Sequence, residues 1–251
     1  MQKQVSYLGY SERGIFNSII YYLLSHPEFM TDFLKSIGIT DEVCLSSNST
    51  FTILGEQSFS DFGDSDMVII AKNDFKKIVI FFEGKVKTYQ GKFSLNTNFE
   101  NLKNAKEING FSSNLFVQLY YKFLLTEVLK QTKSDDTAQL NINKFFKKGK
   151  DKENRKIGNN GIVKRACEKL KSDEYYYVAI IPKAAEPDTF IKKYEGLNRT
   201  VLKDMPMPLK TTKCISWENI KELFEKRENN NIVTENFNYN YNETENKGQI
   251  Y

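Results

Sequence analysis

Two short runs of apolar residues, separated by one polar turn, constrain the fold of this chain more than any other feature. Residues 67–71 and 78–82 are rich in Val, Ile and Phe, and a Lys-Asn-Asp turn begins the segment between them. Continuous apolar runs of this length are typical of strands that are buried on both faces. The sequence therefore predicts a hairpin of two neighbouring core strands.

Ionisable residues border both of these strands, although core strands normally carry none. Asp66 directly precedes the first run, and Glu83, Lys85 and Lys87 follow the second. Because side chains alternate across a pleated strand, the last three residues share one face. We expect two acids and a lysine to converge at one end of the hairpin.

This arrangement suits metal-dependent hydrolysis of a phosphodiester. Carboxylates are hard oxygen ligands for Mg²⁺, which binds through one or two acids and a substrate phosphate. The ion orients a water and neutralises charge in the transition state. A lysine beside it positions or deprotonates the water, or stabilises developing charge. Asp66 followed by Glu83-Gly84-Lys85 resembles the Asp…(Asp/Glu)-X-Lys signature of the PD-(D/E)XK, or restriction-endonuclease-like, nuclease superfamily.

The resemblance implies a three-layer α/β/α fold with a central mixed β-sheet, built around an αβββαβ core. It also implies that Asp66 and Glu83 bind a catalytic Mg²⁺, for which Mn²⁺ is a substitute, and that Lys85 completes the catalytic set. Lys87 would help to hold the scissile strand. Ser65 stands where many members have proline. The alternative interpretation is an ordinary solvated hairpin end with a salt bridge.

Glu12 is a candidate for a further metal ligand. It lies at the start of a predicted helix over residues 11–25, and its spacing places it with the buried stripe. The stretch Ser-Glu-Arg-Gly resembles the early helical acid of members of the superfamily, which implies that Glu12 binds the metal and that Arg13 contacts phosphate. The alternatives are an acid at the positive end of the helix dipole and a surface arginine. Glu56 is a secondary ligand candidate or a surface residue.

A local basic segment is the candidate nucleic-acid contact. The whole chain has 36 Lys and Arg against 32 Asp and Glu, so affinity for nucleic acid must come from a local patch. Residues 143–156 contain seven basic and two acidic residues, including Lys144, Lys147 and Lys148. Such a segment binds a phosphate backbone without reading its sequence. A solvated loop is the alternative.

Composition excludes several other kinds of site. The chain has one histidine, which makes Ser-His-Asp hydrolysis and zinc sites with several imidazoles hard to assemble. Its three cysteines are far apart, as expected of reduced thiols in a cytoplasmic protein. A kinase or nucleotide triphosphatase is disfavoured because no Gly-rich phosphate loop with a following Lys-Ser/Thr is present. No signal peptide or membrane span is predicted.

Residues 1–228 are expected to form one domain, and the Asn- and Glu-rich residues 229–251 a flexible tail. Helical periodicity and strand-like runs predict the elements that surround the hairpin. The predicted helices span 27–37, 101–106, 112–131, 161–171 and 217–227, and the predicted strands span 51–54, 175–182 and 211–215.

The sequence thus predicts a Mg²⁺-dependent endonuclease that acts on double-stranded DNA, in restriction, repair or defence. A homodimer with two symmetric sites suits cleavage of both strands of a duplex. Two alternatives stay open, because fold resemblance does not fix function. In the first, the chain is a catalytically inactive nucleic-acid-binding module on the same fold. In the second, it is a protein-interaction domain in which the motif arose by chance.

Overall fold

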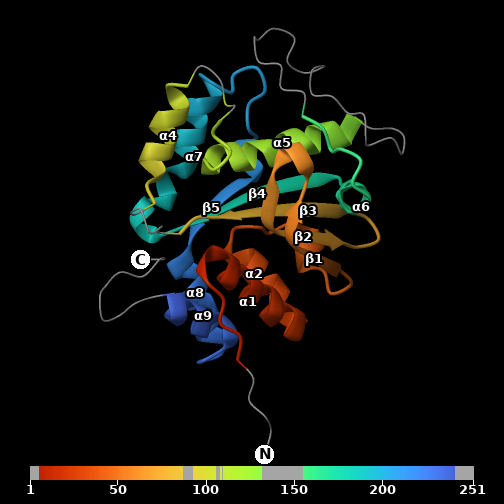
Figure 1. The fold of residues 1–251 in the computed structure, drawn as a ribbon. Helices are drawn as coiled ribbons and strands as arrows, with labels where there is room; N and C mark the ends of the chain where they lie inside the picture. The colour runs from red at the N-terminus through yellow and green to blue at the C-terminus, as the bar shows by residue number, and fades with distance from the viewer. Residues whose placement is uncertain (1–5, 87–92, 106–107, 109, 132–154, 241–251) are drawn as a thin grey trace, which may run out of the picture.

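A computed structural model of the chain shows a central five-stranded sheet between two layers of helices (Figure 1). The structure describes residues 6–86, 93–105, 108, 110–131 and 155–240. This is a three-layer α/β architecture with a mixed sheet, which confirms the expected fold class.

The sheet has the strand order β1-β2-β3-β4-β5. The first three strands form an antiparallel meander, and β4 and β5 add to it in parallel. The predicted hairpin is confirmed, because Met67 lies opposite Phe82 and Lys72 opposite Lys77. The strands are β1 (Thr50–Ser58), β2 (Asp64–Lys72), β3 (Lys77–Gly84), β4 (Glu174–Ile181) and β5 (Thr212–Ser216).

One layer of helices covers the face of the sheet that includes Val68 and Ile70 of β2 and Val79 and Phe81 of β3. The central helix of this layer, α5, packs against β3 and β4 (Figure 1). The layer consists of α4 (Leu95–Lys103), α5 (Leu115–Gln131), α6 (Gly161–Lys169) and α7 (Phe190–Asn198).

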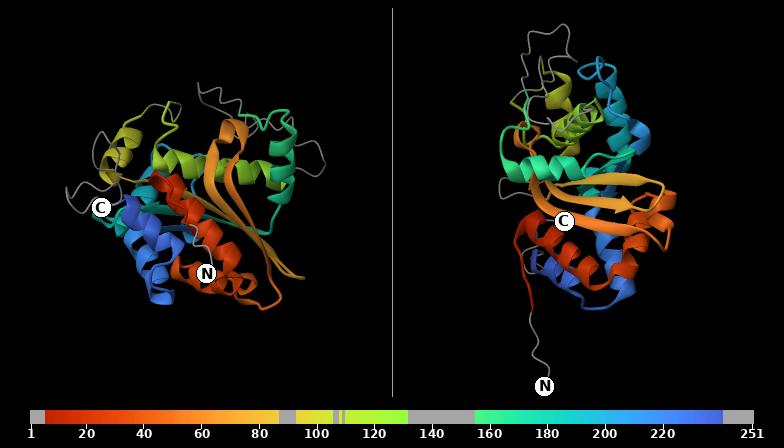
Figure 2. Two further views of the ribbon diagram at one scale, coloured as in Figure 1. Left: turned by 60° about the horizontal axis from the view of Figure 1, so that its bottom comes forward. Right: turned by 90° about the vertical axis from the view of Figure 1, so that its right-hand side faces the viewer.

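The second layer covers the alternate residues of the same strands, among them Met67, Ile69, Ile80 and Phe82. Figure 2 shows the sheet between the two layers from the side. Burial on both faces is the reason that the two hairpin runs are continuously apolar. The layer consists of α1 (Ser11–Ser25), the 3-10 turn η1 (Pro27–Phe29), α2 (Met30–Ser36), α3 (Glu42–Leu45), α8 (Trp217–Arg227) and α9 (Ile232–Asn240).

Most of the other predicted elements lie within a few residues of their expected bounds, and α8 coincides with its predicted range. The helix expected over 101–106 lies earlier, at α4, where Ser94 caps it by accepting from the Thr97 N–H. The short helix α3 and the whole of α7 were not predicted.

The prediction of a flexible tail from residue 229 is wrong for α9. Val233 and Phe237 are buried against α1 and α8, and two asparagines bond to the backbone of residues 7–11. Asn236 accepts from the Gly9 N–H and donates to the Tyr7 carbonyl, each at 2.7 Å. Asn240 accepts from the Ser11 N–H and donates to the Gly9 carbonyl. The asparagines that suggested disorder therefore pair with an extended segment, as a neighbouring strand would. Residues 241–251 lie outside the described residues.

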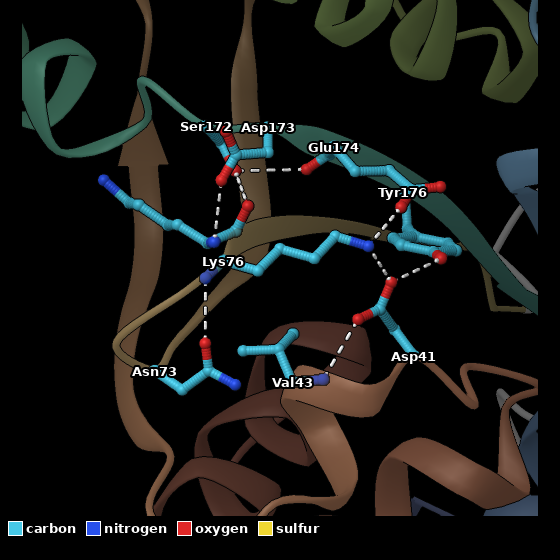
Figure 3. A network of polar contacts seen from close by, with 9 residues as sticks. Asp41, Val43, Asn73, Lys76, Ser172, Asp173, Glu174 and Tyr176 are labelled. Carbon is cyan, nitrogen blue, oxygen red and sulfur yellow. Dashed lines mark hydrogen bonds and ion pairs between the residues drawn. The ribbon is translucent and has the colours of Figure 1, made fainter.

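A polar network closes the end of the sheet where β3 begins (Figure 3). The ammonium of Lys76, in the β2–β3 turn, contacts the carboxylates of Asp41 and Glu174. Asp41 also accepts from the Val43 N–H and so caps α3. Burial raises the pKa of Asp41, but the bonds from Lys76 and Val43 outweigh it and hold that pKa below its ordinary value. This network joins α3, the hairpin turn and β4.

Candidate active site at the end of the hairpin

Asp66 and Glu83 face the same side of the sheet at the end of the β2–β3 hairpin. They lie next to the paired residues Met67 and Phe82, one position further toward the end of the hairpin. Because side chains alternate between the two faces, Asp66 and Glu83 are on the face that α5 covers. The Oδ2 atom of Asp66 accepts a hydrogen bond from the Gly84 N–H at 2.7 Å. The hairpin therefore brings together the two acids that the sequence predicted as a pair.

The environment of Asp66 disfavours its ionised form. The pKa of this carboxyl is raised to about 7, first by burial and then by the negative charge of Glu83. The hydrogen bond from Gly84 and the positive charge of Lys85 act in the opposite direction. A cation placed between two such carboxylates would relieve both the desolvation and the mutual repulsion.

Glu83 is buried and pairs with a lysine that no sequence motif indicated. Its Oε1 atom lies 3.0 Å from the Nζ atom of Lys122 in α5, and both side chains are almost completely inaccessible. The two groups form an ion pair at this distance, although their angles do not meet those of a hydrogen bond. Burial raises the pKa of Glu83, and the charges of Lys122 and Lys85 oppose that rise.

The backbone that carries Glu83 and Lys85 is fixed by the neighbouring strand β4 and by the opposite layer of helices. The Lys85 N–H donates to the Ile180 carbonyl of β4, and its carbonyl accepts from Nε1 of Trp217 at 2.8 Å. A Cβ atom at Gly84 would lie 2.7 Å from the rings of Phe16 and Trp217. The glycine in Glu83-Gly84-Lys85 is thus required by close packing, which the motif alone did not reveal.

The third acid, Glu12, lies at the first turn of α1 and is partly exposed. Its side chain accepts a hydrogen bond from the Ser11 hydroxyl. Its charge contributes to the raised pKa of Asp66, after the larger effects of burial and of Glu83. Within the described residues, no group of three or more His, Cys, Asp or Glu side chains is arranged to hold a metal ion.

Glu56 and Arg13, the secondary candidates, bind each other. Arg13 Nε lies 3.0 Å from the Glu56 carboxylate, and both side chains are exposed. Glu56 has a φ of +47° and stands in β1 level with Asp66, between the register pairs Gly55–Met67 and Gln57–Ser65. This ion pair favours a surface role for both residues over metal or phosphate binding.

The predicted nucleic-acid contacts Lys87, Lys144, Lys147 and Lys148 all lie outside the described residues. The end of the same basic segment, however, is placed. The Lys156 N–H donates to the Asp61 carboxylate at 2.8 Å, and Arg155 donates to the Asp61 carbonyl.

Asp61 belongs to the 3-10 turn η2 (Ser60–Phe62), which immediately precedes β2. Arg155 and Lys156, the described end of the basic segment, therefore lie beside the turn that precedes the strand carrying Asp66.

The residues present fit a divalent metal ion held by two carboxylates. Asp66 and Glu83 offer hard oxygen ligands on one face and their charges repel, while the Oε1 atom of Glu83 also contacts the ammonium of Lys122. Mg²⁺ commonly completes its shell with water and substrate phosphate when a protein offers one or two acids.

Comparisons of the chain with known proteins identify no relative. No family model matches the chain, and searches of curated proteins and of solved structures find no match. Among the described residues, no helix is both long and apolar enough to cross a membrane.

Proposed function

We propose that the chain is a metal-dependent nuclease whose centre consists of Asp66, Glu83 and Lys85. The observation that carries the proposal is the placement of two partly or fully buried carboxylates side by side on one sheet face, with a lysine two residues further along. A buried acidic pair with one disfavoured charge is expensive unless it serves a bound cation or a reaction.

The order of elements supports the same proposal. The chain runs through α1, the meander β1–β3, the helix α5 and then β4, which is parallel to β3. This order agrees with the αβββαβ core that the restriction-endonuclease-like resemblance implies, with α4 inserted before α5. The two acids also stand on the strands where that resemblance expects them.

The chain's own residues would have distinct tasks in the reaction. Asp66 and Glu83 would bind the metal, which when bound activates water and offsets charge on the phosphate. Lys85 would hold a phosphate oxygen or orient the attacking water, since its charge already acts on both carboxylates. Trp217 and Ile180 would keep the Lys85 backbone in place throughout.

The proposed substrate is double-stranded DNA. The basic segment 143–156 carries a local excess of positive charge, and its described end contacts η2 next to β2. Such charge binds phosphates independently of sequence, so affinity should fall steeply as salt rises. A homodimer that cuts both strands stays a prediction.

A cleavage assay tests the proposal. Supercoiled and linear DNA are incubated with wild type, Asp66→Asn or Lys85→Met, in Mg²⁺, in Mn²⁺ and in EDTA. We expect metal-dependent cutting by wild type and a loss of about 10²-fold or more in either variant, because each removes a group that acts on the transition state.

Asp32→Asn and Lys35→Met are matched controls, since both residues are exposed on α2 at the opposite face of the sheet. Both controls should cut like wild type. Wild type that cuts with neither metal, or equal cutting by Asp66→Asn, would contradict the proposal.

A binding module without turnover is the second candidate. The Glu83–Lys122 ion pair favours it, because this pair neutralises Glu83 without any metal. DNA binding that is unaffected by EDTA, together with no cleavage in Mg²⁺ or Mn²⁺, would support this candidate over the nuclease.

A further inference from the structure

Lys122 links the two segments that carry the candidate metal ligands. Its Nζ atom lies 3.0 Å from Oε1 of Glu83 and donates to the Phe62 carbonyl at 3.1 Å. Phe62 ends η2, and the chain then turns through Gly63, with a φ of +76°, into β2 and Asp66. One ammonium group therefore contacts both Glu83 and the turn that leads to Asp66.

A charge at this position is costly for a purely structural residue. Lys122 has no exposed surface, and its neighbours in α5, among them Leu119 and Leu125, are fully buried and apolar. Replacing a buried ion pair by apolar residues of similar volume is often neutral or stabilising. If position 122 had only a packing role, a leucine or methionine there would stabilise the fold at least as well as a lysine.

The next turn of α5 offers a contrast. Thr126 and Tyr177 of β4 share a hydrogen bond of 2.6 Å between their hydroxyls, and both side chains are buried. This neutral contact ties α5 to the sheet without any charge. The ion pair of Lys122 and Glu83 lies one helical turn away from this contact, at the position where Glu83 is next to Asp66.

We propose that Lys122 is a positioning residue for the metal site. It holds the Glu83 carboxylate and the start of β2 in a fixed relation, so that Asp66 and Glu83 are arranged for a divalent ion before the ion binds. The inference rests on the proposed function. It assigns to Lys122 no contact with substrate.

Preorganisation by such outer contacts has a measurable consequence. Removal of a residue that orients a metal ligand typically lowers metal affinity by about 10–100-fold. A lysine that merely stabilised the fold would change the unfolding temperature of the protein and leave its metal affinity unchanged. Metal affinity therefore separates the two roles.

The test is calorimetric titration of Mn²⁺ into wild type, Lys122→Met and Thr126→Val, with folding of each checked by circular dichroism. Lys122→Met keeps the volume and removes the charge, whereas Thr126→Val removes an equally buried polar contact on the same helix. We expect Lys122→Met to bind Mn²⁺ about 10–100-fold more weakly and Thr126→Val to bind it like wild type.

Equal affinity of wild type and folded Lys122→Met would overturn the inference, and so would the same loss in Thr126→Val. Lys122→Gln, which is smaller and keeps a hydrogen-bond donor, serves if Lys122→Met does not fold, with a weakened affinity again expected. Cleavage of DNA by wild type is measured in parallel. Cutting with unchanged affinity in the variants would refute the positioning role alone, whereas absence of both Mn²⁺ binding and cutting in wild type would refute the proposed function with it.

Discussion

Asp66 illustrates how one side chain at a strand end provides chemistry at a cost in stability. Its pKa of about 7 in the folded state lies well above the ordinary value of 3.8. The folded protein therefore holds a proton that the unfolded chain has already released between these two values. Ionisation of the folded state is the unfavourable step, so the stability that Asp66 contributes is greatest at low pH and is lost as pH rises toward 7.

The substitution Asp66→Asn should remove this cost in the absence of metal. Asparagine keeps an oxygen that accepts from the Gly84 N–H but carries no charge. Because each unit of pKa corresponds to about 1.4 kcal/mol, we expect the variant to exceed wild type in stability by a few kcal/mol at pH 8, with the difference disappearing near pH 4. Urea unfolding in EDTA at several pH values measures it. A wild type that is the more stable protein at pH 8 would refute this prediction.

The residues of the site differ in how far the sequence could reveal them. Asp66 and Glu83 were predictable as a pair because side chains alternate along strands and the hairpin register follows from its two apolar runs. Lys122 was not, because its contact depends on how α5 packs on the sheet. The available signal was a lysine within the apolar stretch from Leu119 to Leu125 of α5, and its partner is distant in sequence.

At the scale of elements, α9 holds the start of α1. Asn236 and Asn240 lie one helical turn apart, and each pairs with a backbone donor and a backbone acceptor in residues 7–11. Glu12 follows this segment directly. Asparagine is a weak helix former, which is why propensity and composition predicted a tail where the structure has a helix. Tertiary hydrogen bonds outweigh that local preference.

The substitution Asn236→Ala tests the role of α9. It leaves the Gly9 N–H and the Tyr7 carbonyl without their partner, and an unsatisfied group costs about 1–3 kcal/mol. We expect a destabilisation of that size by urea unfolding, together with faster amide exchange at Gly9. Asn238→Ala, an exposed position on the same helix, is the control and should change neither quantity. Equal effects of the two substitutions would exclude a specific clamp.

At the scale of the whole molecule, the hydrophobic pattern of the sequence predicted the fold class, but it did not predict every helix or the polar contacts between elements. Buried strand runs alternating with amphipathic helices predict a sheet covered on both faces, and the three layers confirm this. The helix α7 was missed because it is short, directly follows two 3-10 turns and has no side-chain N-cap, although Phe190, Tyr194 and Leu197 have helical spacing. The network of Asp41, Lys76 and Glu174 joins residues from three elements, which no local pattern encodes.

The central claim is that Asp66 and Glu83 bind one divalent ion at the end of the hairpin. Its most direct test is a crystal of the wild-type protein soaked in Mn²⁺ and measured for anomalous scattering. We predict one strong anomalous peak between the two carboxylates, and no peak there in crystals of Asp66→Asn treated in the same way. A wild-type crystal with saturating Mn²⁺ and no peak at these carboxylates, or a peak only elsewhere, would contradict the claim.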